Sequence, residues 1–197
     1  MKKLITALLT ATLLIASLAY AAGTLADAEK AYVAGNYKQA IKLTKVLALK
    51  GDATAQYNLG AMYDIGQVVS QDYAEAVKWY KLAATQGYPA AQTNLAIMYS
   101  VGKGVVQDYA EAVKWYKLAA EQGDAQAQYN LGVGYDNGHG VVQDYAEAVK
   151  WYKLAATQGV KDAINGRDIT AKKMTQQQIA EAQKLAKDCL AKKYKGC

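Results

Sequence analysis

The sequence repeats itself with a period of 36 residues. The string QDYAEAVKWYKLAA occurs three times without a change, beginning at Gln71, Gln107 and Gln143. The full units cover residues 51–86, 87–122 and 123–158. A fixed period of this length is typical of helix hairpins that stack in a line, each hairpin contacting only its neighbours. The sequence therefore predicts an all-α solenoid rather than a single globular core.

Each unit carries the signals of two helices. The first helix is expected to begin after Asp52 and its equivalents, and Pro89 in the middle unit suits a first helical position. Glycine follows this helix at a site that favours a left-handed C-terminal cap. The second helix opens with Asp72 and Glu75 in capping-box spacing. The helix-ending glycines are Gly66, Gly102 and Gly138 for the first helices, and Gly87, Gly123 and Gly159 for the second.

The second helix of each unit is apolar on two sides. Tyr73, Val77 and Tyr80 lie on one side, and Trp79 and Leu82 lie on the other. A helix of this kind must contact both its own partner and the next hairpin. We therefore expect the repeated tryptophans to be buried as core anchors. They are Trp79, Trp115 and Trp151.

The two ends of the chain depart from the repeat, as the caps of a solenoid must. Residues 22–50 predict an N-terminal hairpin in which AYVAGNYKQAIKL echoes the later units with a shorter loop. Residues 159–197 predict C-terminal capping helices, the last of which opens with Thr175 and Gln178 as a capping box.

The only two cysteines, Cys189 and Cys197, lie in this C-terminal segment. On one continuous helix their Cα atoms would be about 12 Å apart, too far for a bridge, whose limit is about 7 Å. A disulfide therefore requires the helix to end between them, and Gly196 offers a flexible return. The alternative is a reactive thiol or an intermolecular bond.

The first 21 residues have the pattern of a secretory signal peptide. Lys2 and Lys3 precede an apolar run over residues 4–18, and the segment ends in Ala19, Tyr20 and Ala21. We expect cleavage after Ala21, with Ala19 as the competing position. The run is shorter than the roughly 18 residues of a membrane span, so the mature protein is expected to be periplasmic or secreted, with no stable insertion in the membrane.

The charge of the chain argues against a nucleic-acid partner. The formal net charge is +6, and removal of the two leader lysines lowers it to +4 (6 − 2). This value is too small to indicate nucleic-acid binding.

The run AQYNLGVGYDNGHGVVQDYAEAVKWYKLAATQG resembles a Sel1-like repeat, a relative of the tetratricopeptide repeat. The resemblance covers residues 51–159, and MTQQQIAEAQKLA is similar to the terminal cap of that family. It implies a right-handed α-solenoid whose first helices line a concave groove for partners. Val68 departs from the pattern, because the other units have Gly104 and Gly140 there, which questions the geometry of the first loop.

The residues needed for catalysis are sparse. The chain after the leader has one histidine, His139, in a glycine-flanked loop where a solvated position is expected, and two serines, Ser70 and Ser100. No metal-ligand motif, nucleophile elbow or phosphate loop is recognisable. We therefore expect no catalytic site, metal or cofactor. The alternative is a hydrolase or binding protein for cell-wall or β-lactam substrates. Some cysteine-rich secreted relatives are associated with β-lactams, but their repeats carry paired cysteines that these repeats lack.

The differences among the units predict a binding surface. Of the 36 aligned positions, 13 differ, and 12 of those fall in the first 20. Thr54, Tyr57, Ala61 and Asp64 share one face of the first helix, and all four positions vary between units. This favours a groove that binds a protein or peptide, and the alternative is drift at tolerant positions after duplication. The expected groove residues are Tyr57, Asp64, Thr93, Ile97, Ser100, Gln126, Tyr129 and Asp136.

Lysines on the second helices offer a rival surface for anionic polymers or lipid head groups. Glutamates three residues before a lysine can pair with it, which favours a solvated face instead. The repeated lysines are Lys78, Lys81, Lys114, Lys117, Lys150 and Lys153. The sequence as a whole predicts a non-catalytic scaffold or adaptor for protein interactions, with the basic surface and the hydrolase as alternatives.

Overall fold

The computed structural model describes residues 23–197 as ten helices without a strand. The predicted leader, residues 1–21, lies outside the described residues. The helices are α2 (Leu25–Val33), α3 (Tyr37–Leu49), α4 (Ala53–Ile65), α5 (Tyr73–Thr85), α6 (Pro89–Val101), α7 (Tyr109–Ala120), α8 (Ala125–Asn137), α9 (Tyr145–Thr157), α10 (Lys161–Ala171) and α11 (Gln176–Ala191).

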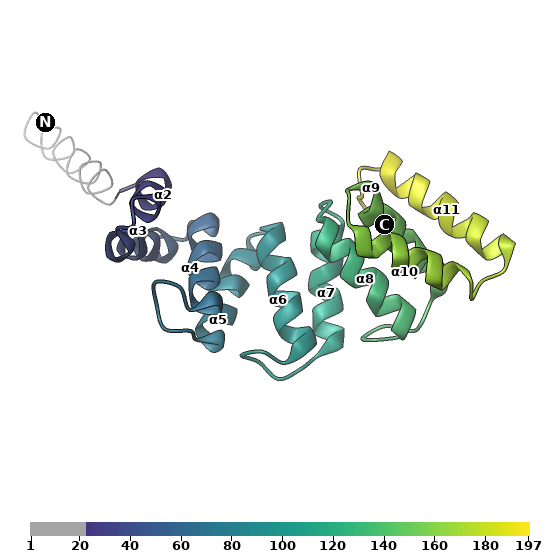
Figure 1. Ribbon diagram of the computed structural model, residues 1–197, viewed down its shortest axis with the longest axis horizontal. Coiled ribbons are helices and arrows are strands. Elements are labelled where there is room, and N and C mark those ends of the chain that lie inside the picture. The colour runs from purple at the N-terminus through teal and green to yellow at the C-terminus, as the bar shows by residue number, and fades with distance from the viewer. Residues whose placement is uncertain (1–22) are drawn as a thin grey trace, which may run out of the picture.

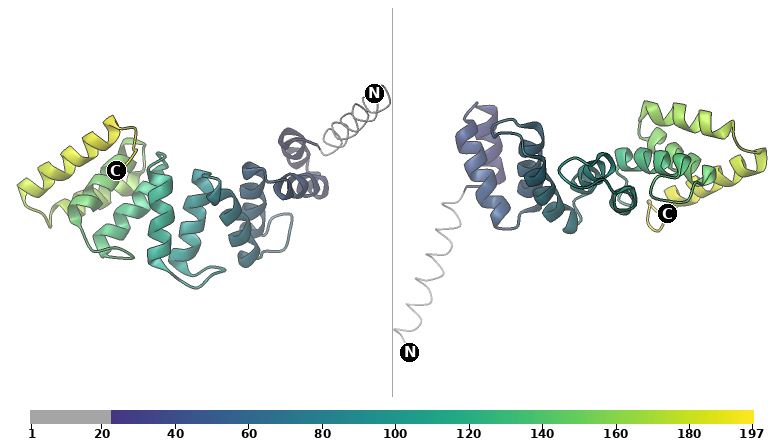
Figure 2. Two further views of the ribbon diagram at one scale, coloured as in Figure 1. Left: turned by 180° about the vertical axis from the view of Figure 1, so that it is seen from behind. Right: turned by 90° about the horizontal axis from the view of Figure 1, so that it is seen from below.

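Helices α2 to α9 pair as successive hairpins in a curved array, and α10 and α11 both pack on α9 at its C-terminal end (Figures 1 and 2). Within each unit the two helices pack closely, as in α4 with α5, and each second helix also packs against the first helix of the next unit. The predicted all-α solenoid is thereby confirmed.

The helix boundaries follow the capping residues. The carboxylate of Asp52 accepts a hydrogen bond from the Ala55 backbone N–H at 2.7 Å, and that of Asp72 accepts one from Glu75 at 3.0 Å. The expected reciprocal bond from Glu75 is absent, because its carboxylate binds Lys78 instead. Thr175 and Gln178 do form the complete capping box.

Buried glutamines join successive units. In the first helix of the middle unit, the Gln92 amide donates to the Ala84 carbonyl at 3.1 Å and accepts from Gln122 Nε2 at 2.8 Å. The carbonyl belongs to the last turn of the preceding second helix and also accepts from the Gly87 N–H at 3.0 Å, so Gln92 supplies its second hydrogen bond. Gln56 and Gln128 make the same pair of bonds, with Ala48 and Gln86 and with Ala120 and Gln158 respectively.

The tryptophans are not equivalent, which corrects the expectation of three core anchors. Trp151 is 2% exposed, but Trp79 and Trp115 are only half-buried. The cause is α11, which packs against α9 and covers Trp151 in the third unit. The corresponding sides of α5 and α7 remain open, so Leu82 and Leu118 are 47% and 46% exposed.

The C-terminal cap is closed by the predicted disulfide, which is confirmed between Cys189 and Cys197, with Cα atoms 5.4 Å apart. The helix ends at Ala191, and Lys193, Tyr194 and Gly196 adopt positive φ angles that turn the chain back. The predicted end of the helix between the two cysteines is therefore observed.

Candidate partner-binding face

The first helices present one face along the array, which we call the first-helix face and define by Asn58, Asn94 and Asn130. These asparagines occupy the same position in each unit and are all half-buried. Sequence comparison missed them because it selected positions that vary, and these do not. Their identity in all three units was the signal available.

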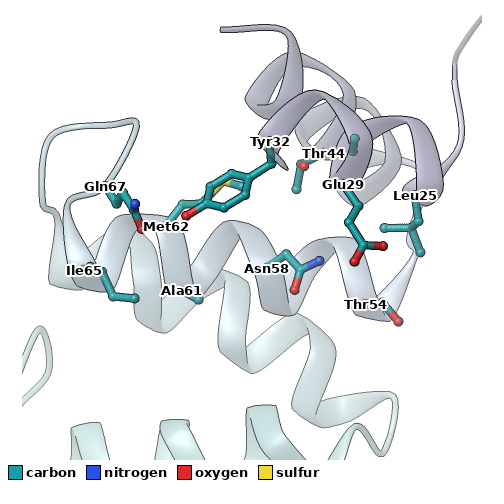
Figure 3. Close-up of a pocket in the computed structure, with 11 residues that line it drawn as sticks. Leu25, Glu29, Tyr32, Thr44, Thr54, Asn58, Ala61, Met62, Ile65 and Gln67 are labelled. Atoms are coloured by element: carbon teal, nitrogen blue, oxygen red, sulfur yellow. The ribbon is translucent and has the colours of Figure 1, made fainter. Parts of the chain in front are cut away.

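A cleft of about 480 Å³ opens on this face at its N-terminal end, between α2 and α4. Leu25 and Tyr32 of α2 face Asn58 and Met62 of α4 across it, with Glu29 at its rim (Figure 3). The lining is mostly apolar with a few polar groups, which is the usual composition of a binding site. The residues from α2 were not predicted, because the N-terminal hairpin lies outside the repeat.

A second hollow, of about 250 Å³, lies between the second and third units. Its walls come from α7 and α8, including Tyr116, Asn130 and Val133, and Ser100 of α6 borders it. His139 and Tyr109 also line the hollow, and their rings stack with centroids 4.7 Å apart. One predicted groove residue, Ser100, therefore lines this hollow.

The predicted tyrosines pack against the tyrosine of the second helix of their own unit, and Tyr57 also packs against the first residues of the next unit. The Tyr57 ring lies 5.9 Å from that of Tyr80 and 5.1 Å from that of Tyr88, and Tyr129 lies 5.8 Å from Tyr152. Burial raises the pKa of the Tyr57 hydroxyl.

Thr93 replaces tyrosine in the middle unit and is 4% exposed, with no hydrogen-bond partner for its hydroxyl. It lies too deep to contact a partner, which corrects its assignment to the groove. The middle unit also has Ala96 where the other units have Gly60 and Gly132. A Cβ atom at either of those glycines would lie 2.7 Å from the ring of Tyr80 or Tyr152. The changes to threonine and to alanine therefore occur together in one unit.

The predicted aspartates bind lysines of the following hairpin. Asp64 lies 3.3 Å from the Lys103 ammonium, and Asp136 lies 3.0 Å from that of Lys173. In the middle unit Ser100 takes the place of aspartate and donates to its own helix, at the Ile97 carbonyl. Both carboxylates therefore already have a partner within the chain.

The remaining predicted residues differ in exposure. Gln126 is exposed and donates to the Asn130 side-chain oxygen at 3.1 Å, and Ile97 is half-buried against the core. His139 is exposed as expected, but it is packed on Tyr109 rather than free in solvent.

The model of the Sel1 repeat matches residues 53–88, 89–124 and 125–160. The chain belongs to the Sel1 repeat family. Among curated proteins, none matches this chain.

Solved structures of Sel1 proteins are similar to this chain. A protective antigen present in uropathogenic Escherichia coli strains, displaying an SLR fold, is 38% identical with a TM-score of 0.73, over 80% of this chain and 34% of that chain. This Sel1 protein thus spans about a third of that antigen's length. A Sel1 repeat protein from Oxalobacter formigenes is 39% identical, with a TM-score of 0.59, over 64% of this chain and 94% of that one. Helicobacter pylori cysteine rich protein B, at 23% identity, has a TM-score of 0.50 over 73% of this chain and 96% of that one, and shares the fold.

The lysines do not form a continuous ridge along the Sel1 units. Lys78 and Lys114 are exposed and pair with glutamates, but Lys150 is 3% exposed. Its ammonium binds Glu147 and the Cys197 carbonyl, at 2.6 and 2.8 Å, and lies 4.6 Å from the centre of the Trp151 ring. The C-terminal cap therefore removes this lysine from the predicted basic surface.

Within residues 23–197 of this Sel1 protein, no three His, Cys, Asp or Glu side chains are grouped as metal ligands would be. In the same range, no helix combines the length and apolar character needed to cross a membrane.

Proposed function

We propose that this protein is a non-catalytic scaffold that binds an extended segment of a partner protein along the first-helix face. Sel1 repeats generally mediate protein interactions. The observation that carries the proposal is that both hollows on this face have an asparagine in their lining, Asn58 in the larger and Asn130 in the smaller.

The chemistry of these sites suits a peptide. A carboxamide both donates and accepts hydrogen bonds, so it can pair with a backbone N–H and a backbone C=O of the same residue in an extended partner. The apolar walls beside it accept side chains. Amides spaced along the array would hold the backbone, and the hollows would select the side chains between them.

We propose further that the chain is exported, with the leader cut after Ala21, and that it works in the periplasm or outside the cell. The Cys189–Cys197 disulfide supports this proposal because such bonds persist in oxidising compartments. Mass spectrometry of protein recovered from a bacterial host tests the cleavage. A mass that retains residues 1–21 would contradict it.

The binding proposal is tested in two stages. The mature protein captures partners from envelope extracts, and the affinity of a purified partner is then measured for two variants. Asn58→Ala with Asn130→Ala removes the amides, and we expect at least a tenfold loss, from about 1 kcal/mol for each lost hydrogen bond. Asn94 is left intact because it lines neither hollow.

The matched control is Lys78→Ala with Lys114→Ala on the second helices, which should leave the affinity unchanged. Loss of binding in the control instead of the asparagine variant would move the site to the lysine surface. Turnover of cell-wall or β-lactam substrates by the native protein, lost on heat denaturation, would contradict a non-catalytic role.

A further inference from the structure

The hollow between the second and third units occupies the place that a methionine fills one unit earlier. Met98 of α6 is 2% exposed and belongs to the same buried cluster as Ala76, Val77 and Tyr80 of α5. The corresponding position of α8 is Gly134.

The residues of α7 that correspond to that cluster line the hollow beside Gly134; they are Ala112, Val113 and Tyr116. The hollow is therefore lined by the residues equivalent to those that surround Met98, but α8 supplies no side chain to fill it.

Packing does not require glycine at this position. A Cβ atom on Gly134 would lie 3.6 Å from Val113 Cγ2 and 3.5 Å from the His139 carbonyl oxygen, which are ordinary contacts. By contrast, Gly132 in the same helix has the Tyr152 ring 2.7 Å from such an atom. Glycine in a helix interior lowers the stability of a protein relative to alanine. Gly134 therefore costs stability, and its lack of a side chain leaves the hollow empty.

The rim of this hollow also differs from the preceding unit boundary. Ser100 and His139 stand where Asp64 and Lys103 form an ion pair. The polar groups of the hollow are the Tyr116 hydroxyl, Ser100 and Asn130, with His139 and Tyr109 beside them. The lining contains no carboxylate and no lysine. A neutral apolar group can therefore enter without displacing a salt bridge.

We propose that this hollow binds one unbranched or γ-branched apolar side chain, of methionine or leucine size, from the partner segment. The inference rests on the proposed function, and it names the side chain that the first-helix face selects. The volume of about 250 Å³ is below the roughly 300 Å³ at which pockets for drug-sized ligands begin, and the buried Met98 shows which side chain fits these walls. Asn130, at the edge of the hollow, is placed to bind the backbone of the entering residue.

Peptides selected from a random displayed library on the full mature protein, and then synthesised, serve as the probe. Gly134→Met fills the hollow from within, and Val142→Met adds the same side chain at a loop position that is 89% exposed. We expect the selected peptides to share a methionine or leucine. Replacing that residue by alanine, or introducing Gly134→Met, should weaken binding at least tenfold, and Val142→Met should leave it unchanged.

Circular dichroism and the melting temperature verify folding, and Gly134→Met is expected to melt several degrees higher because a helix-favouring side chain replaces glycine. If it melts lower, Gly134→Leu takes its place. Peptides that bind the filled variant as well as the native protein, yet still require Asn58 and Asn130, would overturn the side-chain site and leave the proposed function standing. Peptides that bind independently of these asparagines, or no peptide binding at all, would overturn both.

Discussion

Lys103, in the loop of the second unit, places its ammonium 3.3 Å from the Asp64 carboxylate of the first unit and 4.0 Å from the centre of the Tyr73 ring. Desolvation lowers the pKa of Lys103, but hydrogen bonds to Tyr73 and Asp64 and the Asp64 charge outweigh it and raise the pKa. At the next boundary both partners change together, to Ser100 and His139. The position of Asp64 in one unit and the position of Lys103 in the next unit therefore change together.

The first prediction concerns that ion pair. Asp64→Ala, Lys103→Ala and the double variant form a cycle in urea unfolding, and we expect a coupling energy of about 0.5–1 kcal/mol, because both side chains are partly exposed and screened by solvent. The coupling should shrink in high salt. A coupling of zero at low salt would mean that the contact contributes nothing to joining the units.

The second prediction concerns the buried glutamines. Gln92→Ala removes one hydrogen bond from the Ala84 carbonyl, which still accepts from the Gly87 N–H, and one from the Gln122 amide, which still donates to the Leu118 carbonyl. The expected loss is about 1–2 kcal/mol of unfolding free energy, because two hydrogen bonds are removed at about 1 kcal/mol each. Gln122→Ala, on the exposed side of the pair, should cost less. Urea unfolding measures both, and equal losses would contradict the assignment of Ala84 as the group that matters.

The helices and caps could be predicted from the sequence because their causes are local. The Asp52 cap, the glycine at position 66 and the spacing of apolar residues act within a few residues of one another. The disulfide was equally accessible, since Cys189 and Cys197 are eight residues apart.

The candidate site was less accessible because it depends on contacts between units. The partners of Asp136 and Lys150 are Lys173 and the Cys197 carbonyl, which lie in the irregular cap, where the period gives no guidance. Variation marked Thr93 as a groove residue, although the position is buried. Packing within the unit and contact with a partner produce the same variation in sequence, and the burial of each side chain in the folded protein distinguishes the two causes.

The third prediction concerns Val68, which adopts a φ of +76°, against +75° for Gly104 and +77° for Gly140. The first loop therefore has the same backbone conformation as the other two loops, although valine replaces glycine there. A β-branched residue is strained in this left-handed conformation. We expect Val68→Gly to stabilise the protein by about 1 kcal/mol.

The reverse change, Gly104→Val, should be severely destabilising, since its Cβ would lie 2.4 Å from the Tyr73 carbonyl oxygen. Thermal unfolding compares the two variants. A lower melting temperature for Val68→Gly would show that the valine makes packing contacts worth more than the strain.

The fourth prediction is a loss of stability at alkaline pH. Burial raises the pKa of Tyr80, Tyr116 and Tyr152 above the ordinary value of 10.0. In the unfolded chain these hydroxyls ionise near pH 10, whereas in the native protein they keep their protons. Above that pH the unfolded state therefore binds fewer protons, and stability that is complete below pH 10 falls as the pH rises.

Tyrosinate absorbance and helical circular dichroism, followed together from neutral pH upward, measure this effect. The ionisation of the buried tyrosines should coincide with the loss of helix. Tyr152→Phe removes one of the three groups and should make the decline of the melting temperature with pH less steep. Complete tyrosine ionisation while the helix signal is intact would contradict the burial argument.

The last prediction concerns the C-terminal cap. The Cys189–Cys197 bond closes a short loop whose final carbonyl holds Lys150 over Trp151. For a loop of eight residues the chain-entropy relation gives about 2.5 kcal/mol of stabilisation, lost in Cys189→Ser with Cys197→Ser. Because α11 covers Trp151 while the other two tryptophans are already half-exposed, opening of the cap should shift tryptophan emission to longer wavelength. In a Trp151→Phe background the same pair of serine substitutions should shift emission little, which assigns the signal to the cap. An unchanged urea midpoint and emission spectrum after reduction would show that α11 remains in place on α9 without the bond.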